Sequence, residues 1–179
     1  MKSFNDIIDD VFIKEGDVYS EPPLNDQPTG RGGITLKAYQ RFCDAMQPNR
    51  HVTKLDLQAL AHEEARAVVR WLLNELHREM GLGAVTFDPL RLQLLDFGYN
   101  SGGERAIRWL QRVIHVPRTG LMDIATVRQI GGMEQYLIHQ ALIAARLQMI
   151  DSWTDAPANK KYEEGLENRA LSFSLLKVP

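Results

Sequence analysis

Two short stretches of sequence are the basis for predicting the fold and the candidate site: Lys14-Glu15-Gly16-Asp17-Val18-Tyr19 and Gly32-Gly33-Ile34-Thr35. Upstream of the first, Ser3 followed by Asp6 resembles a helix start, and apolar residues recur at helical spacing from Phe4 to Phe12. Gly16 is a typical residue just past a helix end. Glu15 therefore lies at the C-terminal end of the predicted helix. The negative end of the helix dipole favours the protonated form of a carboxyl group there, as a proton donor requires.

The segment between the two stretches reads SEPPLNDQPTGRGG over residues 20–33. Its three prolines and three glycines exclude a helix and disfavour a central strand, so we expect a loop or a small, irregular β-hairpin. Thr35 then caps a helix that ends near Met46. This arrangement places a polar loop beside Glu15.

The rest of the chain is also helical in pattern, which predicts a mainly α fold of about six to eight helices. We expect a helix over residues 56–80 that is broken near its start. We also expect a long helix over 133–153 with these core residues: Leu137, Ala141, Leu142, Ala144, Ala145 and Ile150. The other helices are expected over 87–100, 104–114, 123–131 and a final segment that includes Tyr162 and Phe173.

The composition is that of a globular protein, 44% hydrophobic and 25% charged, with a net charge of -2. It gives no electrostatic reason to expect a nucleic-acid partner. No apolar run approaches the roughly 20 residues of a membrane span, and the acidic N-terminus does not resemble a signal peptide. Cys43 is the single cysteine and is expected to be buried. We expect a monomer made in the cytoplasm.

Carboxylates are the best candidates for chemistry in this chain. Phosphate-binding, zinc-protease and esterase motifs are absent, and the five histidines are scattered, so we expect no metal and no cofactor. Glycoside hydrolysis needs a protonated acid and a second group that guides water or stabilises positive charge. Glu15 is the candidate acid, and Asp17, Asp26 and Thr35 are candidate second groups. Each of these three could equally hold a turn or cap a helix.

Tyr99 and Asn100 form a second candidate site at the end of an apolar helix. A tyrosine ring can stack on a sugar, and an asparagine amide can bind hydroxyl or acetamido groups. The same asparagine could instead serve as a helix C-cap. We therefore expect Tyr99 and Asn100, together with Tyr19, to contact a glycan if the protein is a glycosidase.

These residues resemble a known family, glycoside hydrolase family 108. Glu15-Gly16, the following loop and Gly33-Ile34-Thr35 are similar to its E-G-G-Y and G-I-T signature, although Asp17-Val18 replaces a glycine. The second half is similar to the peptidoglycan-binding segment usually fused to it. The matching residues there are Asp96, Asn100, Gly102, Ala106, Leu110-Gln111, Thr119-Gly120, Asp123, Thr126 and Gly165-Leu166-Glu167-Asn168-Arg169.

The resemblance implies a lysozyme-like fold and an N-acetylmuramidase of the phage endolysin or secretion-activator type. It implies that Glu15 is the acid and Thr35 its conserved partner. Residues 1–90 would be the catalytic half and 91–179 a peptidoglycan-binding half, packed as one compact unit. The hydrolase would reach the cell wall through a holin, a secretion system or cell lysis, and would need a local basic face to bind it. The alternatives are a peptidoglycan-binding module without activity and a helical interaction protein.

Overall fold

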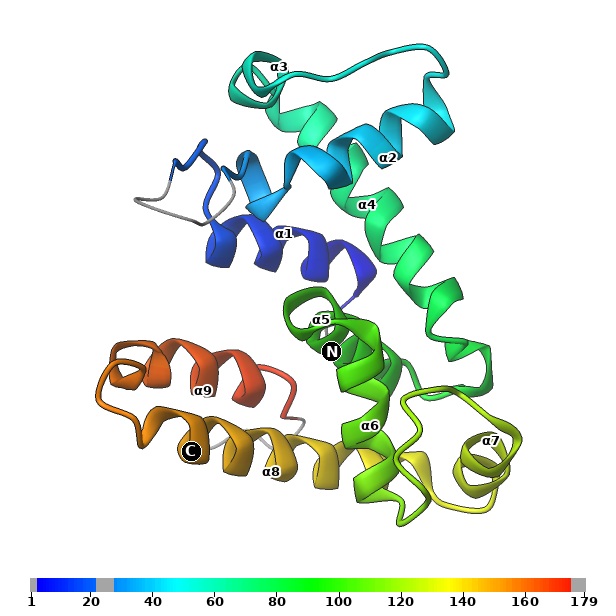
Figure 1. Ribbon diagram of the computed structural model, residues 1–179. Coiled ribbons are helices and arrows are strands. Elements are labelled where there is room, and N and C mark those ends of the chain that lie inside the picture. The colour runs from blue at the N-terminus through cyan, green and yellow to red at the C-terminus, as the bar shows by residue number, and fades with distance from the viewer. Residues whose placement is uncertain (1–2, 22–27, 175–179) are drawn as a thin grey trace. The chain divides into compact units, whose positions relative to one another are not determined.

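The computed structural model in Figure 1 describes residues 3–21 and 28–174. Nine α-helices and three short 3₁₀ helices form in these ranges, together with isolated β-bridges and no strand. The expected mainly α fold is confirmed. The expected number of helices was too low because the segment expected as one broken helix forms two, α3 (Lys54–Gln58) and α4 (His62–Glu79). No helix in the described ranges has the length and apolar character needed to span a membrane.

Contacts divide the chain into two compact units, and the division falls within α4. The N-terminal unit comprises Ser3–Glu75, and the C-terminal unit begins at Leu76. The expected division into a catalytic and a binding half near residue 90 concerns function and stays a prediction. Each unit is described separately below.

The N-terminal unit contains α1 (Phe4–Glu15), the 3₁₀ helix η1 (Arg31–Gly33), α2 (Leu36–Met46), α3 and most of α4. Ser3 caps α1 in a capping box with Asp6, and the hydroxyl of Thr35 caps α2, both as expected. The core residues of this unit come from one face of each helix: Ile7, Ile8, Val11, Phe12, Tyr39, Phe42, Cys43, Val68, Val69 and Leu73. The expected burial of Cys43 is thus confirmed.

The C-terminal unit contains η2 (Leu82–Ala84), α5 (Asp88–Ser101), α6 (Gly103–Val113), α7 (Ile124–Gly131), α8 (Gln135–Thr154), η3 (Lys160–Tyr162) and α9 (Glu163–Leu171). Pro89 lies in the first turn of α5, where its missing N–H costs nothing. Residues 92–98 of α5 are all buried, and α5 contacts both α6 and α8. Figure 1 shows α9 lying alongside α8.

The expected inward face of α8 is partly wrong. Leu142, Ala145 and Ile150 are buried as expected, but Leu137 is 55% exposed. The expected core residues Ala141 and Ala144 are also exposed. Apolar residues occupy every face of this helix, so spacing alone could not identify the face that packs against α5 and α6.

A buried glutamine holds the turn between α6 and α7. The Gln111 side-chain amide donates to the hydroxyls of Thr119 and Thr126 and accepts from the Gly120 backbone N–H at 2.8 Å. Gly120 has φ +80, and a Cβ there would lie 2.5 Å from Cγ of Glu104. The residues that resemble the peptidoglycan-binding segment in this region therefore stabilise a turn.

Candidate active site

Glu15 is the last residue of α1, and its side chain lies over the backbone of Gly33. A Cβ added at Gly33 would be 3.2 Å from the Glu15 Cβ and 3.4 Å from Oε2. Gly33 also has φ +71, a conformation that favours glycine. The two stretches identified in the sequence thus meet in the fold. Glu15 is exposed to solvent, so its carboxyl group is accessible to a ligand from outside.

A backbone hydrogen bond joins the two stretches directly. The Gly32 N–H donates to the Gly16 carbonyl at 2.7 Å. A Cβ on Gly32 would lie 3.1 Å from the Phe12 ring and 3.3 Å from Val69. The glycine pair therefore lets η1 approach the end of α1 closely enough to support the Glu15 side chain.

Asp17 forms an ionic cluster next to Glu15. Its carboxylate lies 3.0 Å from Nη1 of Arg31 and 2.9 Å from Nδ1 of His62. The Arg31 guanidinium also donates to the backbone carbonyls of Asp17 and Leu60. The hydrogen bond from His62, followed by that from Arg31, lowers the pKa of Asp17, so this carboxylate stays ionised. Of its two candidate roles, these contacts favour holding the turn.

Thr35 has a defined structural role at the start of α2. Its hydroxyl accepts a hydrogen bond from the Ala38 N–H at 3.2 Å, and its backbone forms a β-bridge with Thr29. Thr29 forms a second bridge with Ser20, which closes the irregular loop expected after α1. A threonine hydroxyl that accepts one bond can still donate another, so this cap leaves Thr35 able to bind a water molecule.

The other N-terminal candidates differ in what the structure says of them. Tyr19 is half-buried beside Lys54. The hydrogen bond that Lys54 donates to the Glu21 carboxylate is the main cause that raises the pKa of Lys54, and Tyr19 contributes less. Asp26 lies outside the described residues.

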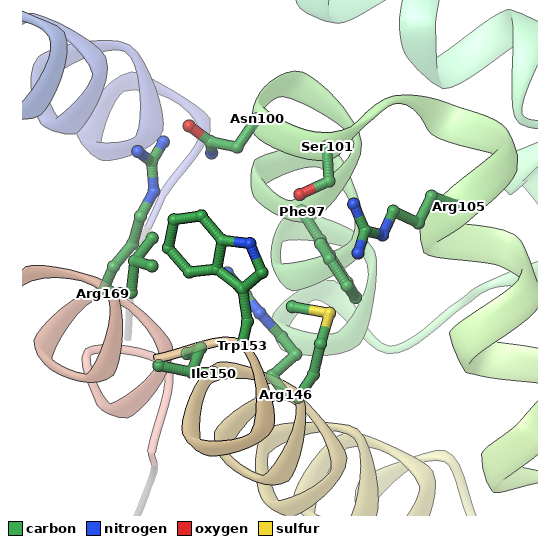
Figure 2. Close-up of a pocket in the computed structure, with 10 residues that line it drawn as sticks. Phe97, Asn100, Ser101, Arg105, Arg146, Ile150, Trp153 and Arg169 are labelled. Carbon is green, nitrogen blue, oxygen red and sulfur yellow. The ribbon is translucent and has the colours of Figure 1, made fainter. Parts of the chain in front are cut away.

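Tyr99 and Asn100 belong to the C-terminal unit. Tyr99 is half-buried, and Asn100 is exposed at the end of α5. The Asn100 side-chain amide donates to the backbone carbonyl of Asp96 at 2.6 Å. Asn100 also lines a pocket of about 240 Å³ between α5, α8 and α9, which is shown in Figure 2. The C-cap of α5 is Gly102, so the alternative role of Asn100 as the C-cap is wrong.

Several pairs of charged residues around these sites could not be predicted from the sequence. The Asp17–His62 pair joins residues 45 positions apart. Asp96 pairs with Arg146 and Arg169, which are 50 and 73 positions away. The sequence offered only a weak signal, since Asp96 and Arg169 belong to the stretches that resemble the peptidoglycan-binding segment. Within the described ranges, no group of three His, Cys, Asp or Glu side chains is placed to hold a metal ion.

Comparison with known proteins establishes the fold. No protein-family model matches the chain, and no curated protein matches it in sequence. The structure is similar to that of SagA from Brucella abortus, with a TM-score of 0.65 over 98% of both chains at 24% identity. The chain has the SagA fold. A likeness at this identity extends to the architecture and not to the chemistry of the site.

Proposed function

We propose that the protein is a peptidoglycan hydrolase, an N-acetylmuramidase that cleaves the glycan strand between N-acetylmuramic acid and N-acetylglucosamine. One observation supports this most strongly. The exposed Glu15 carboxyl group lies over the Gly33 backbone, which brings together the two stretches that resemble glycoside hydrolase family 108. The SagA fold, shared over 98% of the chain, is consistent with this assignment.

In the proposed reaction, Glu15 acts as the general acid. Its protonated carboxyl group donates a proton to the glycosidic oxygen as the bond to the leaving sugar breaks. Positive charge then develops on the sugar ring. Because Glu15 is exposed in the free protein, its carboxyl group is accessible to the glycosidic oxygen of a bound glycan.

Thr35 is the proposed second group. It lies two residues after Gly33, and its hydroxyl can orient a water molecule for attack, with inversion at the sugar carbon. Asp26 is the alternative. Asp17 is a poorer candidate because Arg31 and His62 already bind both of its carboxylate oxygens. We propose that Tyr19 contacts the glycan in the N-terminal unit, and that Tyr99 and Asn100 form a separate glycan-contacting site within the C-terminal unit.

Replacing Glu15 with glutamine tests the acid. Glu15→Gln keeps the shape of the side chain but cannot donate the proton, so wall lysis should fall by about 10²–10⁴-fold. Glu63→Gln, an exposed residue of the first turn of α4, is the matched control and should lyse walls normally. Turbidity of purified walls gives the rate, and mass spectrometry of released muropeptides identifies the bond.

The outcomes separate three functions. Lysis by Glu15→Gln at the wild-type rate would exclude Glu15 as the acid. A wild-type protein that pellets with peptidoglycan but releases no muropeptide would instead be a binding module without activity. A wild-type protein that does not pellet with peptidoglycan would favour a helical interaction protein.

A further inference from the structure

Arginine side chains lie together on an exposed face of α6 in the C-terminal unit. Arg105, Arg108 and Arg112 are exposed and follow one another at helical spacing, with Trp109 between them. Arg118 is exposed in the turn after α6, and the Arg108 guanidinium donates to its backbone carbonyl at 2.6 Å. This hydrogen bond holds the turn against the helix. All four arginines line one open pocket of about 410 Å³ and thus belong to a single surface.

The end of α8 adds a second tryptophan to this surface. Trp153 is 45% exposed and lines a second open pocket, of about 590 Å³, together with Arg105, Trp109 and Arg112. Figure 2 shows Trp153 and Arg105 where they also line the neighbouring pocket between α5, α8 and α9. Six residues therefore form what is called the Arg/Trp surface below: Arg105, Arg108, Trp109, Arg112, Arg118 and Trp153.

Positive charge is in excess on the Arg/Trp surface. Arg108 pairs with Glu104 at 2.8 Å, and Asp151 lines the same pocket as Trp153. The other three arginines of the surface form no ion pair within residues 3–21 and 28–174. Because these arginines are exposed, their charge is accessible to an anionic partner.

The spacing of the arginines favours a partner with many anionic groups. Arg105 and Arg112 are seven residues apart on α6, which places them about 10 Å apart along the helix axis. Two guanidinium groups at this separation bind different anionic groups more readily than they share one. The surface of an anionic membrane and a nucleic-acid strand both present phosphate groups in this way.

The aromatic rings favour a membrane over a nucleic acid. A base needs an open aromatic face for stacking, but Trp109 is half-buried and the Arg112 guanidinium lies 4.7 Å from its ring centroid. The Trp153 ring lies 5.9 Å from the ring of Tyr162, which is 48% exposed. The exposed Lys161 places its Nζ 4.8 Å from the Tyr162 ring. Exposed Trp and Tyr rings beside cations are suited to the boundary between lipid head groups and water, because each ring is apolar and carries one polar group.

We propose that the Arg/Trp surface docks on the surface of an anionic phospholipid membrane. Its arginines bind lipid phosphate groups, which match the forked N–H donors of a guanidinium group. Trp153 and Tyr162 lie at the level of the head groups, with their rings towards the acyl chains. This binding is peripheral, and it does not rest on the proposed cleavage at Glu15.

Co-sedimentation of the full chain with phospholipid vesicles tests the proposal. Vesicles of phosphatidylglycerol mixed equally with phosphatidylcholine supply an anionic surface, and vesicles of phosphatidylcholine alone supply a neutral one. The protein should bind the anionic vesicles at least about tenfold more tightly, and raising NaCl from about 50 mM to about 500 mM should reduce this difference. Replacing both Arg105 and Arg112 with glutamine should weaken binding about tenfold or more, and Trp153→Ala about threefold or more.

A second double variant provides the matched control. Lys37→Gln combined with Arg70→Gln removes the same charge from exposed residues of α2 and α4, and it should bind the anionic vesicles normally. Circular dichroism checks that each variant folds. Equal weakening in this control would show that only net charge matters and would overturn the proposal.

Other outcomes would overturn the proposal directly. These are no binding to anionic vesicles, equal binding to neutral vesicles, and normal binding by the Arg105 and Arg112 double variant or by Trp153→Ala. A single-stranded oligonucleotide that binds more tightly than the anionic vesicles at the same salt concentration would assign the surface to nucleic acid instead. Since the vesicles contain no glycan, these results do not depend on whether Glu15 is the acid.

Discussion

Replacing Asp96 with asparagine should destabilise the protein far more than removing an exposed carboxylate. The side chain of Asp96 is 1% exposed, and those of its partners Arg146 and Arg169 are 6% and 7% exposed. Asp96→Asn keeps the size of the side chain but removes the negative charge that Asp96 places beside both buried guanidinium groups. Breaking a buried pair in this way costs about 3–5 kcal/mol. For a chain of this length, that loss lowers Tm by about 6–20 °C.

Glu104 provides a matched control in the same unit. Its carboxylate also pairs with an arginine, Arg108, at 2.8 Å, but the two side chains are 68% and 48% exposed. Exposed pairs contribute about 0–1 kcal/mol, so Glu104→Gln should change Tm by only a few degrees. Thermal unfolding followed by circular dichroism at pH 7 measures both. If Asp96→Asn is no more destabilising than Glu104→Gln, burial does not determine the strength of this cluster.

Two further predictions concern the active site and the acid response. Gly33→Ala should reduce wall lysis by about tenfold or more, because the new Cβ would lie 3.2 Å from the Glu15 Cβ at a backbone φ of +71. The control variant Gly131→Ala, whose new Cβ would have no atom within 4 Å, should lyse walls normally. Normal lysis by Gly33→Ala would show that Gly33 does not position the acid. Burial lowers the pKa of His139 below its usual value, so the folded state disfavours the charged form and stability is lost as pH falls below about 6.5. In urea unfolding at pH 7 and pH 5, His139→Gln should lose less stability between the two pH values than wild type or the exposed His115→Gln, and equal losses would contradict the argument.

Helix ends could be predicted because local residues determine them. Ser3, Thr35 and Pro89 each act within their own turn, through a side-chain cap or a fixed φ angle. The sequence predicts a polar loop beside Glu15, and the structure places Gly33 against the Glu15 side chain. These features depend on interactions that a short stretch of sequence already contains.

The buried charge cluster could not be predicted for the opposite reason. Asp96, Arg146 and Arg169 lie on three helices, and an arginine on a helix is normally expected at the surface. The periodicity of α8 gave no indication either, because apolar residues surround the helix and its inward face was predicted only in part. Only the packing of α5, α8 and α9 brings these three charged side chains together.

The chain has a net charge of -2, but its charged residues are distributed unequally along the sequence. Residues 1–75 contain nine Lys or Arg and twelve Asp or Glu, whereas residues 76–179 contain twelve Lys or Arg and eleven Asp or Glu. Three arginines of residues 76–179 lie on one face of α6, namely Arg105, Arg108 and Arg112. They line surface pockets next to Trp109 and Trp153. An anionic membrane would therefore meet a local basic and aromatic surface despite the overall charge. Because this surface and Glu15 belong to different units, we expect that the proposed binding and the proposed cleavage can be lost separately.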